Sequence, residues 1–344
     1  AMAAMSRPGA SAAPAGLRRS VVVLGVTVDD DTLEEAVDEI ARSVDRGRRT
    51  GRRHQITTVN ADFLTNAVCD PDVMAVLRHG DMNIAEGMPL VWAAATLGTP
   101  VRGRVAGVDL VDALADRSAS TGLRLCLLGG GPAVSAEATR LLRIRYPDAD
   151  VVDGGEFPRF DHVDDVDEAV LERTRATGAD VVCVALGNPK QEHFIRRYGP
   201  ELGVPVLIGV GGTLDFIVGR RRRAPVWMQR LGLEWVARAV QEPARLVPRY
   251  ARDAWVCTPR FASQWREQRR GPRVSRPATI RVTGPDHADV VAHGGLDLDG
   301  DVELRAVSSS MRSLCVDLSA VPSADARTIA TLASLARRPA GELR

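Results

Sequence analysis

Glu86 is the carboxylate whose neighbours best suit acid–base chemistry. It lies between an apolar stretch and the Gly-Met-Pro turn at residues 87–89. A carboxylate in apolar surroundings has a raised pKa and can serve as a general base, although an exposed loop glutamate is the alternative interpretation. Arg104, further along the chain, could bind a diphosphate through two guanidinium nitrogens. Asp109 could be a second base or simply a helix cap.

Two polar side chains, Thr58 and Asn60, end an apolar segment upstream of Glu86. A hydroxyl and an amide both donate and accept hydrogen bonds, so these groups could orient the hydroxyl of a sugar or an acceptor. The rival interpretation of Asn60 is a plain N-cap of the next helix.

The only lysine of the chain, Lys190, follows another apolar segment, in the sequence Gly187-Asn-Pro-Lys-Gln-Glu192. Ligands of α/β proteins bind at the carboxyl ends of strands, and a compact ammonium group there suits a phosphate or a sugar hydroxyl. We therefore expect Lys190, together with Gln191 and Glu192, at a binding site. A surface lysine without a role is the alternative.

Two glycine-rich turns come after strand-like segments. They contain Gly129, Gly130 and Gly131 in the first turn, and Gly211 and Gly212 in the second. Glycine lets the backbone approach a phosphate, and a helix N-terminus favours negative charge, but a tight turn explains the first sequence equally well. Neither turn completes the dinucleotide-binding fingerprint, which disfavours an oxidoreductase.

The elements that must position these residues alternate between strands and helices. Strands are expected at 21–28, 54–59, 82–85, 123–128, 151–152, 181–185 and 204–210, with helices at 32–44, 61–68, 72–77, 89–97, 109–120 and 134–146. This alternation predicts an α/β, Rossmann-like fold, with a mostly parallel sheet and helices on both faces.

The chain changes character after residue 218. Residues 219–273 hold 14 arginines against four acidic residues, a net charge of +10, whereas the remainder carries about −9. Four of the five tryptophans lie there too, on helices expected to be broken by Pro225, Pro243, Pro248 and Pro259. Arginines with interfacial tryptophans suit an anionic membrane surface, and a helical cap with core tryptophans is the alternative. No nucleic-acid partner is expected.

Composition and segment boundaries limit the remaining possibilities. The chain has 344 residues, 45% of them hydrophobic, which is ordinary for a globular protein. Its five cysteines are widely spaced, which favours a reducing compartment, and no apolar run approaches the length of a membrane span. We predict a disordered N-terminus at 1–20 without a signal peptide, an α/β domain at 21–218, a basic helical appendage at 219–270, a linker at 271–277 and a small α/β unit at 278–344.

The motifs taken in order resemble the WecG/TagA/CpsF glycosyltransferases over about residues 21–252. They are Thr58-x-Asn60, Glu86-Gly87-Met88-Pro89, Arg104-Val-Ala-Gly-Val-Asp109, Leu127-Leu-Gly-Gly130, Gly155-Glu-Phe-Pro158, Gly187-Asn-Pro-Lys-Gln-Glu192, Gly209-Val-Gly-Gly212, Arg223-Ala-Pro-Val-Trp-Met-Gln-Arg230, Leu233-Glu-Trp235 and Gln241-Glu-Pro243. The resemblance implies an inverting, metal-independent transferase without cofactor. It would move an N-acetylmannosamine-type sugar from a UDP donor to a polyprenyl-diphosphate-linked acceptor, in teichoic acid or surface polysaccharide synthesis.

The same resemblance assigns roles to the candidate residues. Glu86 takes the place of the family's usual aspartate base, with Asn60 beside the sugar and Lys190 and Gln191 in the donor pocket. None of the six histidines has metal-ligand spacing, so arginines and backbone amides must bind the leaving diphosphate. We expect these groups to come from Arg104, the turn at 129–131 and the run Arg220, Arg221, Arg222 and Arg223, with Trp227 at the membrane. The expected location is cytoplasmic, peripheral on the inner face of the plasma membrane.

The last segment, residues 314–332, resembles part of a STAS domain. Asp325 is followed by Ala326, where that family has a phosphorylatable serine. We interpret this segment as a degenerate interaction module that could bind a protein partner, and a homo-oligomer is also possible. The alternative function is a catalytically weak sugar-nucleotide-binding protein that regulates through this tail.

Overall fold

The computed structural model describes residues 19–158, 162–270, 279–282, 287–291, 313–317 and 326–336. The chain divides into two compact units, one formed by residues 21–270 and the other by residues 271–344 with the first 20. The segment predicted to be disordered, 1–20, lies outside the described residues except for its last two, and the predicted linker at 271–277 lies outside them entirely.

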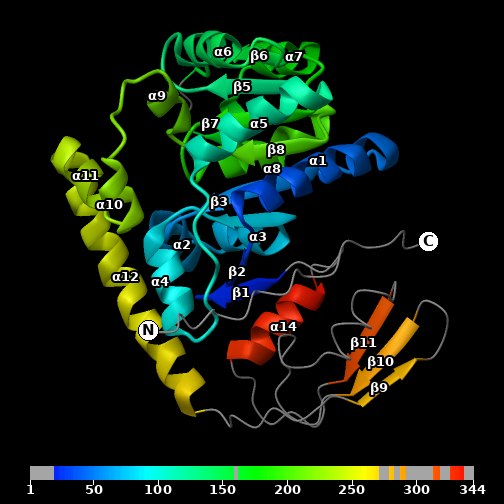
Figure 1. Ribbon diagram of the computed structural model, residues 1–344, viewed down its shortest axis with the longest axis vertical. Coiled ribbons are helices and arrows are strands. Elements are labelled where there is room, and N and C mark those ends of the chain that lie inside the picture. Colours follow the sequence, from blue (N-terminus) through cyan, green and yellow to red (C-terminus); the bar gives the residue numbers. More distant parts are fainter. Residues whose placement is uncertain are drawn as a thin grey trace, which may run out of the picture. The chain divides into compact units, whose positions relative to one another are not determined.

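The larger unit is built on an eight-stranded sheet, and the predicted α/β class is confirmed. The strands are β1 (Ser20–Val23), β2 (Val26–Asp29), β3 (His54–Val59), β4 (Met82–Ala85), β5 (Leu125–Gly129), β6 (Val151–Gly155), β7 (Val181–Ala185) and β8 (Val206–Gly209). Their order across the sheet is β1-β2-β4-β3-β8-β7-β5-β6, and the pairs from β2 to β6 are parallel (Figure 1). The carboxyl ends of these parallel strands therefore meet at one edge of the sheet.

Helices cover both faces of this sheet (Figure 1). They are α1 (Leu33–Thr50), α2 (Ala61–Cys69), α3 (Pro71–His79), α4 (Met88–Thr96), α5 (Gly107–Thr121), α6 (Val134–Arg145), α7 (Glu168–Ala176), α8 (Lys190–Leu202) and the short α9 (Thr213–Ile217). A single turn of 3-10 helix at Val163–Asp165 precedes α7. The alternation expected from the sequence is thus present, with most boundaries shifted by a few residues.

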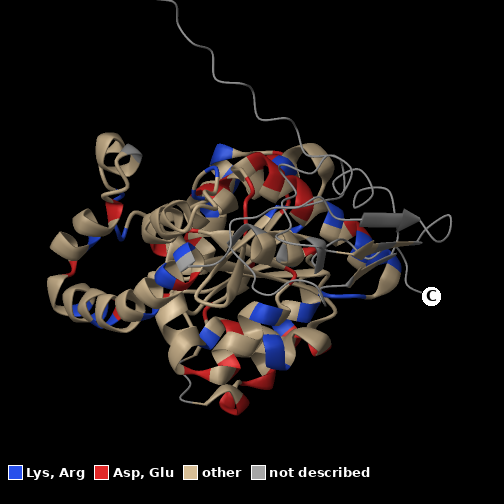
Figure 2. Ribbon diagram, turned by 90° about the horizontal axis from the view of Figure 1, so that it is seen from below, with Lys and Arg blue, Asp and Glu red and all other residues tan. Residues whose placement is uncertain are grey.

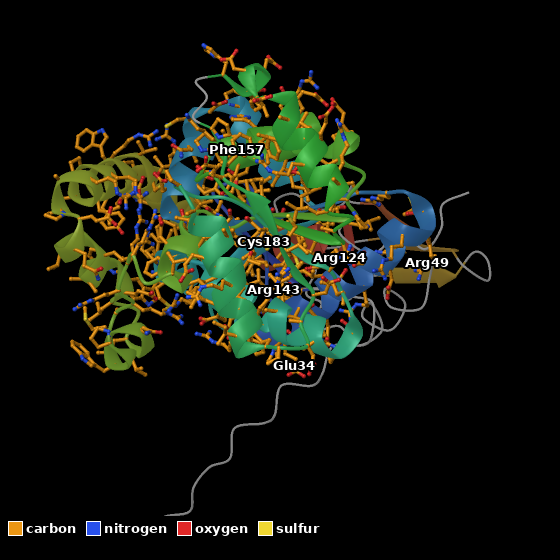
Figure 3. All side chains as sticks on the ribbon, turned by 90° about the horizontal axis from the view of Figure 1, so that it is seen from above. Glu34, Arg49, Arg124, Arg143, Phe157 and Cys183 are labelled. Atoms are coloured by element: carbon orange, nitrogen blue, oxygen red, sulfur yellow. The ribbon has the colours of Figure 1, made fainter. Side chains whose placement is uncertain are left out.

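Strand β7 shows why both faces are covered. Val181 and Cys183 pack with α1, α5 and α6, whereas Val182 and Val184 pack with α7 and α8. Successive side chains of a strand point to opposite faces, so an all-apolar strand must be buried on both sides. Cys183, labelled in Figure 3, is fully buried there as a small apolar side chain.

The prediction of one continuous strand at 21–28 was wrong, because the structure divides this segment into β1 and β2. Leu24 and Gly25 between them have positive φ angles of 52° and 79°. Two consecutive positive φ values are what a type I′ hairpin turn requires. The run of valines on either side conceals this turn in the sequence.

The appendage after residue 218 forms three helices, α10 (Val226–Arg230), α11 (Glu234–Gln241) and α12 (Pro243–Arg270). The expected breaks at Pro248 and Pro259 do not occur, since both prolines lie inside the 28-residue α12. Phe261 and Trp265 of this helix pack against the apolar cluster that includes α2 and α3. This packing offsets the lost backbone hydrogen bonds. In the part of the chain that the structure describes, no helix is long and apolar enough to cross a membrane.

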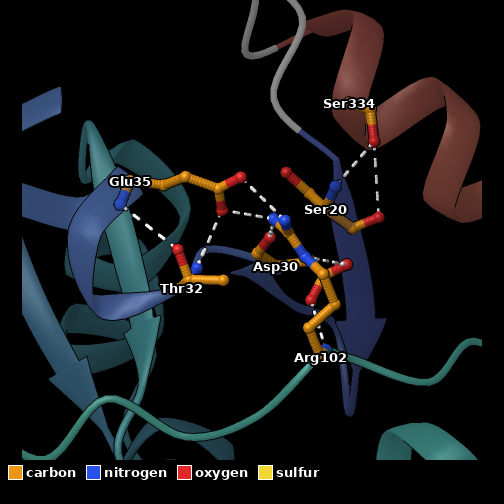
Figure 4. Close-up of polar contacts among 6 residues, drawn as sticks. All are labelled: Ser20, Asp30, Thr32, Glu35, Arg102 and Ser334. Carbon is orange, nitrogen blue, oxygen red and sulfur yellow. Dashed lines mark hydrogen bonds and ion pairs between the residues drawn. The ribbon is translucent and has the colours of Figure 1, made fainter. Parts of the chain in front are cut away.

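The loop that leads to Arg104 is attached to the start of α1 (Figure 4). Thr32 caps α1 in a reciprocal capping box with Glu35. The guanidinium of Arg102 donates to both carboxylate oxygens of Glu35, at 2.7 and 2.5 Å, and its backbone N–H donates to Asp30. These contacts fix the loop between α4 and α5, from which Arg104 reaches the carboxyl edge of the sheet.

The smaller unit contains a three-stranded sheet and a helix. Its described elements are β9 (Thr279–Val282), β10 (His287–Val291), β11 (Ser313–Asp317) and α14 (Ala326–Ala336). The central strand β10 is parallel to β11 and antiparallel to β9. These strands and this helix lie within the small α/β unit expected at 278–344. The likeness to a STAS domain stays a prediction.

Candidate functional site

A cavity of about 460 Å³ lies at the carboxyl edge of the sheet. Its floor comes from residues that follow β3, β4, β5, β7 and β8, and its opposite wall comes from the segment between α10 and α11 and from α11 and α12. Figure 2 marks the basic and acidic positions along these elements. The carboxyl ends of parallel strands are where open α/β sheets bind their ligands.

Glu86 and Asn60 meet because two parallel strands deliver them in register. Val59 of β3 pairs with Ala85 of β4, so the next residue of each strand reaches the same place. The amide nitrogen of Asn60 donates to a carboxylate oxygen of Glu86 at 2.9 Å. The amide oxygen of Asn60 accepts from the backbone N–H of Phe63 at 3.1 Å and caps α2. The two interpretations of Asn60, cap and site residue, therefore hold together.

The electrostatic setting of Glu86 suits a proton acceptor. Burial raises the pKa of this carboxyl group above its ordinary range, and the Asn60 amide, Arg238, the Gly107 backbone N–H and Arg104 oppose the shift. Glu86 lines the cavity, so its carboxylate can meet a ligand. A carboxylate with a raised pKa accepts a proton more readily than an ordinary glutamate does.

Thr58 also lines the cavity and is buried. Its hydroxyl donates to the backbone carbonyl of Gly209 at 2.9 Å, which ties β3 to β8 beneath the site. The proton of this hydroxyl is thus engaged within the fold, and only the lone pairs of the oxygen remain to accept a bond from a ligand.

Gln191 forms hydrogen bonds with the loops after both β7 and β8. Its amide oxygen accepts from the backbone N–H groups of Gly187 at 3.2 Å and Gly211 at 2.9 Å, and its amide nitrogen donates to Glu192 at 2.7 Å. The other carboxylate oxygen of Glu192 accepts from the Asn188 amide at 3.1 Å. The two glycine loops are therefore positioned by one buried amide and one buried acid.

Glu192 does not line the cavity but lies close enough to Glu86 to sense its charge. Burial raises the pKa of Glu192 to about 7, the Gln191 and Asn188 amides oppose the shift, and the negative charge of Glu86 adds to it. Two carboxyl groups that repel each other cannot both ionise easily. A negative charge on either carboxyl group therefore disfavours ionisation of the other.

Only some glycines of the two predicted turns line the cavity. Gly130, Gly187, Gly211 and Gly212 line the cavity, whereas Gly129 and Gly131 are not among its lining residues. Gly130 has a φ of 78°, which favours glycine at the turn between β5 and α6. Lys190, predicted in the donor pocket, is instead an exposed residue at the start of α8, and it does not line the cavity.

Most of the arginines predicted to bind the leaving diphosphate instead contact groups of the protein itself. Arg104 lines the cavity but forms an ion pair with Glu234 at 2.6 Å. Arg223 binds both carboxylate oxygens of Asp109 at 2.6 Å, so neither residue keeps the role predicted for it at the cavity. This bidentate contact occupies both carboxylate oxygens of Asp109 and the guanidinium of Arg223.

The remaining residues of the predicted arginine run have different positions. Arg220 donates to the Pro132 carbonyl. The backbone N–H of Arg222 donates to the side-chain oxygen of Gln241, and the backbone carbonyl of Arg222 accepts from the side-chain nitrogen of Gln241. Arg221 alone of this run lines the cavity, near Asp215 and Glu242. Trp227 is 59% exposed and lies outside the cavity lining.

For six residues of the appendage that line the cavity, no site role was predicted from the sequence. They are Trp235, Arg238, Arg245, Arg249, Tyr250 and Asp253, all of which line the cavity. Three of them, Arg245, Arg249 and Asp253, follow one another at a spacing of four residues, which places them on one face of α12. This spacing was the available signal. The prolines expected to break the helix concealed it.

Within the described residues, no group of three or more histidine, cysteine, aspartate or glutamate side chains could hold a metal ion. The charged groups that face the cavity are two carboxyl groups with raised pKa values, Glu86 and Asp253, three further acids and several arginines. This arrangement suits proton abstraction beside an anionic leaving group.

One family model matches the chain. It is described as the glycosyl transferase WecG/TagA/CpsF family, and it covers residues 21–271. The match contains the whole eight-stranded sheet apart from Ser20, the cavity and the three helices of the appendage.

Proposed function

Because the chain belongs to the WecG/TagA/CpsF family of glycosyltransferases, which act in cell-surface polysaccharide biosynthesis, we propose a specific reaction for it. The protein moves an N-acetylmannosamine-type sugar from a UDP donor to a polyprenyl-diphosphate-linked sugar acceptor, with inversion at the anomeric carbon. The observation that carries this proposal is Glu86, a raised-pKa carboxyl held by Asn60 in a cavity walled by arginines.

Glu86 performs the proton transfer. The carboxylate accepts hydrogen bonds from the Asn60 amide and the Gly107 backbone N–H, and its remaining lone pairs can accept from the acceptor hydroxyl. As the hydroxyl oxygen forms its bond to the anomeric carbon, its proton passes to Glu86 and the bond between that carbon and UDP breaks. Attack from the side opposite UDP inverts the configuration. The glutamate carries one methylene more than the aspartate usual in this family, so its acceptor hydroxyl lies correspondingly further from the strand.

The departing diphosphate is stabilised by arginines of the appendage. Arg238 and Arg245 line the cavity from the wall opposite the sheet, and Arg221 lines it from the segment between α9 and α10. Guanidinium groups bind phosphate oxygens through two parallel hydrogen bonds and stabilise the negative charge that develops on the leaving group. This role replaces the one predicted from the sequence for Arg220, Arg222 and Arg223.

The outer face of the appendage suits a membrane surface. Its exposed large apolar side chains are Val226, Trp227, Leu231, Val240, Val247 and Trp255. Aromatic and aliphatic side chains beside arginines favour the interface of an anionic bilayer, where a polyprenyl-linked acceptor is found. We infer peripheral attachment to the inner face of the plasma membrane. A teichoic acid product, a protein partner of the small C-terminal unit and a homo-oligomer remain proposals from the sequence.

The direct test is release of UDP from a panel of UDP-sugars, with and without a short-chain polyprenyl-diphosphate-GlcNAc acceptor. The proposal predicts acceptor-dependent release from UDP-N-acetylmannosamine or its uronic acid. Release from another UDP-sugar would correct the donor. Binding of UDP without release from any donor would favour the alternative, a sugar-nucleotide-binding regulatory protein.

A further inference from the structure

Asp253 of α12 is a buried acid without a hydrogen-bond partner. It is 5% exposed and lines the cavity. Among the described residues, neither of its carboxylate oxygens has a partner at hydrogen-bonding geometry. The neighbouring Thr65 hydroxyl opposes the rise that burial causes in the pKa of Asp253, yet it donates to the Ala61 carbonyl at 2.9 Å. Asp253 thus retains its full capacity to accept bonds from a ligand.

Three other buried acids of this chain accept hydrogen bonds from the protein. Asp29 accepts from the Asn83 backbone N–H at 2.7 Å, Asp180 accepts from the Arg124 backbone N–H at 2.8 Å, and Glu192 accepts from two amides. Leaving a buried carboxylate without donors destabilises a fold. Asp253 is therefore poorly explained as a structural residue, and a ligand that brings donors would satisfy it.

The surroundings of Asp253 indicate what kind of ligand this is. Asp62, in the first turn of α2, also lines the cavity, and its negative charge raises the pKa of Asp253 further. A guanidinium nitrogen of Arg249 lies 3.6 Å from a carboxylate oxygen of Asp62. The guanidinium of Arg252 donates to the side-chain oxygen of Asn66 at 2.9 Å. Asp253 and Asp62 present two carboxylates whose negative charge Arg249 and Arg252 offset only in part, and they disfavour a diphosphate. They suit a neutral group rich in O–H and N–H donors, which describes a sugar.

Resting on the proposed function, we propose that Asp253 and Asp62 form the subsite that binds the acceptor sugar, by accepting hydrogen bonds from its hydroxyl and amide groups. Asp62 comes two residues after Asn60, which holds Glu86, so this wall adjoins the base. The base must contact the acceptor hydroxyl. The glycine loops after β5, β7 and β8, which suit a diphosphate, lie further along the sheet edge.

The test compares Asp253→Asn and Asp253→Leu with the wild type. Hydrogen bonds to charged groups contribute enough that losing them raises the acceptor KM about tenfold. The donor KM stays within about twofold in both variants. The thermal unfolding midpoint is unchanged or higher, because the substitution removes an unpartnered buried carboxylate. Glu267→Gln, an exposed acid of the same helix outside the cavity, is the matched control and leaves all three quantities unchanged.

Several results would overturn this assignment. An unchanged acceptor KM would contradict it, as would an increase confined to the donor KM, which would assign the subsite to the donor sugar. A lower unfolding midpoint in Asp253→Asn would show a structural role. If the wild type releases no UDP, binding of the polyprenyl-diphosphate-GlcNAc acceptor is compared with binding of the same lipid diphosphate without sugar. Sugar-dependent binding lost in Asp253→Asn would retain the subsite while the transferase reaction fails, and sugar-independent binding would refute the subsite.

Discussion

At the scale of single residues, the site depends on two carboxyl groups in different settings. Glu86 faces the cavity, whereas Glu192 is enclosed beneath it with both oxygens bound by amides. Both have raised pKa values, and each raises the cost of ionising the other. The pair therefore favours a single negative charge, and Glu86 is the member that a ligand in the cavity can contact.

Glu192→Gln tests this arrangement through stability. The pKa of Glu192 in the fold, about 7, lies above its ordinary value of 4.5, so the neutral form is favoured in the native state. The stability contributed by its protonation is fully present below about pH 4.5 and is lost as the pH rises through about 7. Relative to the wild type, we expect the glutamine variant to gain up to about 3 kcal/mol of unfolding free energy between pH 4 and pH 8. Urea denaturation at each pH measures it, and a pH-independent difference would contradict the raised pKa.

The sequence predicted the polar residues of the sheet edge and failed with the charged pairs. Glu86, Asn60 and Thr58 follow directly from strand ends, so a local pattern suffices to find them. The pairing of Arg223 with Asp109 and of Arg104 with Glu234 joins residues 114 and 130 positions apart. No local pattern reveals such partners, and this is why Asp109 was a candidate base as well as a candidate helix cap, and why Arg223 was predicted to bind the diphosphate.

At the scale of elements, register between parallel strands accounts for the arrangement of the site. Buried strands such as β7 were predictable because an apolar run of strand length is typical of a parallel sheet. The hairpin between β1 and β2 and the unbroken α12 were not predictable in this way. The first depends on backbone angles that valines conceal, and the second depends on packing against α2 and α3 that outweighs two prolines.

Arg238 of α11 tests the contribution of the appendage to the site. It lines the cavity, and its charge lowers the pKa of Glu86. In Arg238→Gln we expect about tenfold weaker UDP binding, because a charge-assisted phosphate contact is lost. The pKa of Glu86 rises further in the variant, so the acid limb of kcat/KM moves to higher pH. Calorimetric titration and a pH–rate profile measure the two effects.

The control for this prediction is Arg266→Gln, an exposed arginine of α12 that does not line the cavity. It leaves UDP affinity and the pH profile unchanged. Equal losses of affinity in both variants would show a general effect of net charge and would remove Arg238 from the site.

At the scale of the whole molecule, the basic appendage has two different faces. Four of its arginines line the cavity, and a set of large apolar side chains is exposed outside the cavity lining. The sequence predicted a basic, tryptophan-rich segment but not this division. The alternative of core tryptophans holds for Trp265, which packs against the apolar cluster, and not for Trp255, which is 84% exposed.

Trp255→Gln tests the membrane proposal. An exposed tryptophan beside arginines adds apolar burial to electrostatic attraction at an anionic interface. We expect the variant to lose several-fold in its binding to vesicles that contain anionic phosphatidylglycerol, measured by co-sedimentation, while UDP affinity is unchanged. Binding by the wild type weakens as salt is raised. Equal sedimentation of wild type and variant would show that this face does not contact the bilayer.

The measurement that tests the central claim most directly is single-turnover UDP release by Glu86→Gln, with UDP affinity measured in parallel. Glutamine keeps the size of the side chain and its contact with Asn60 but cannot accept the proton at catalytic pH. The account predicts that turnover falls at least a hundredfold while UDP affinity stays within a few fold, since general-base catalysis contributes about 10²–10⁴ in rate. Turnover close to that of the wild type would contradict Glu86 as the base.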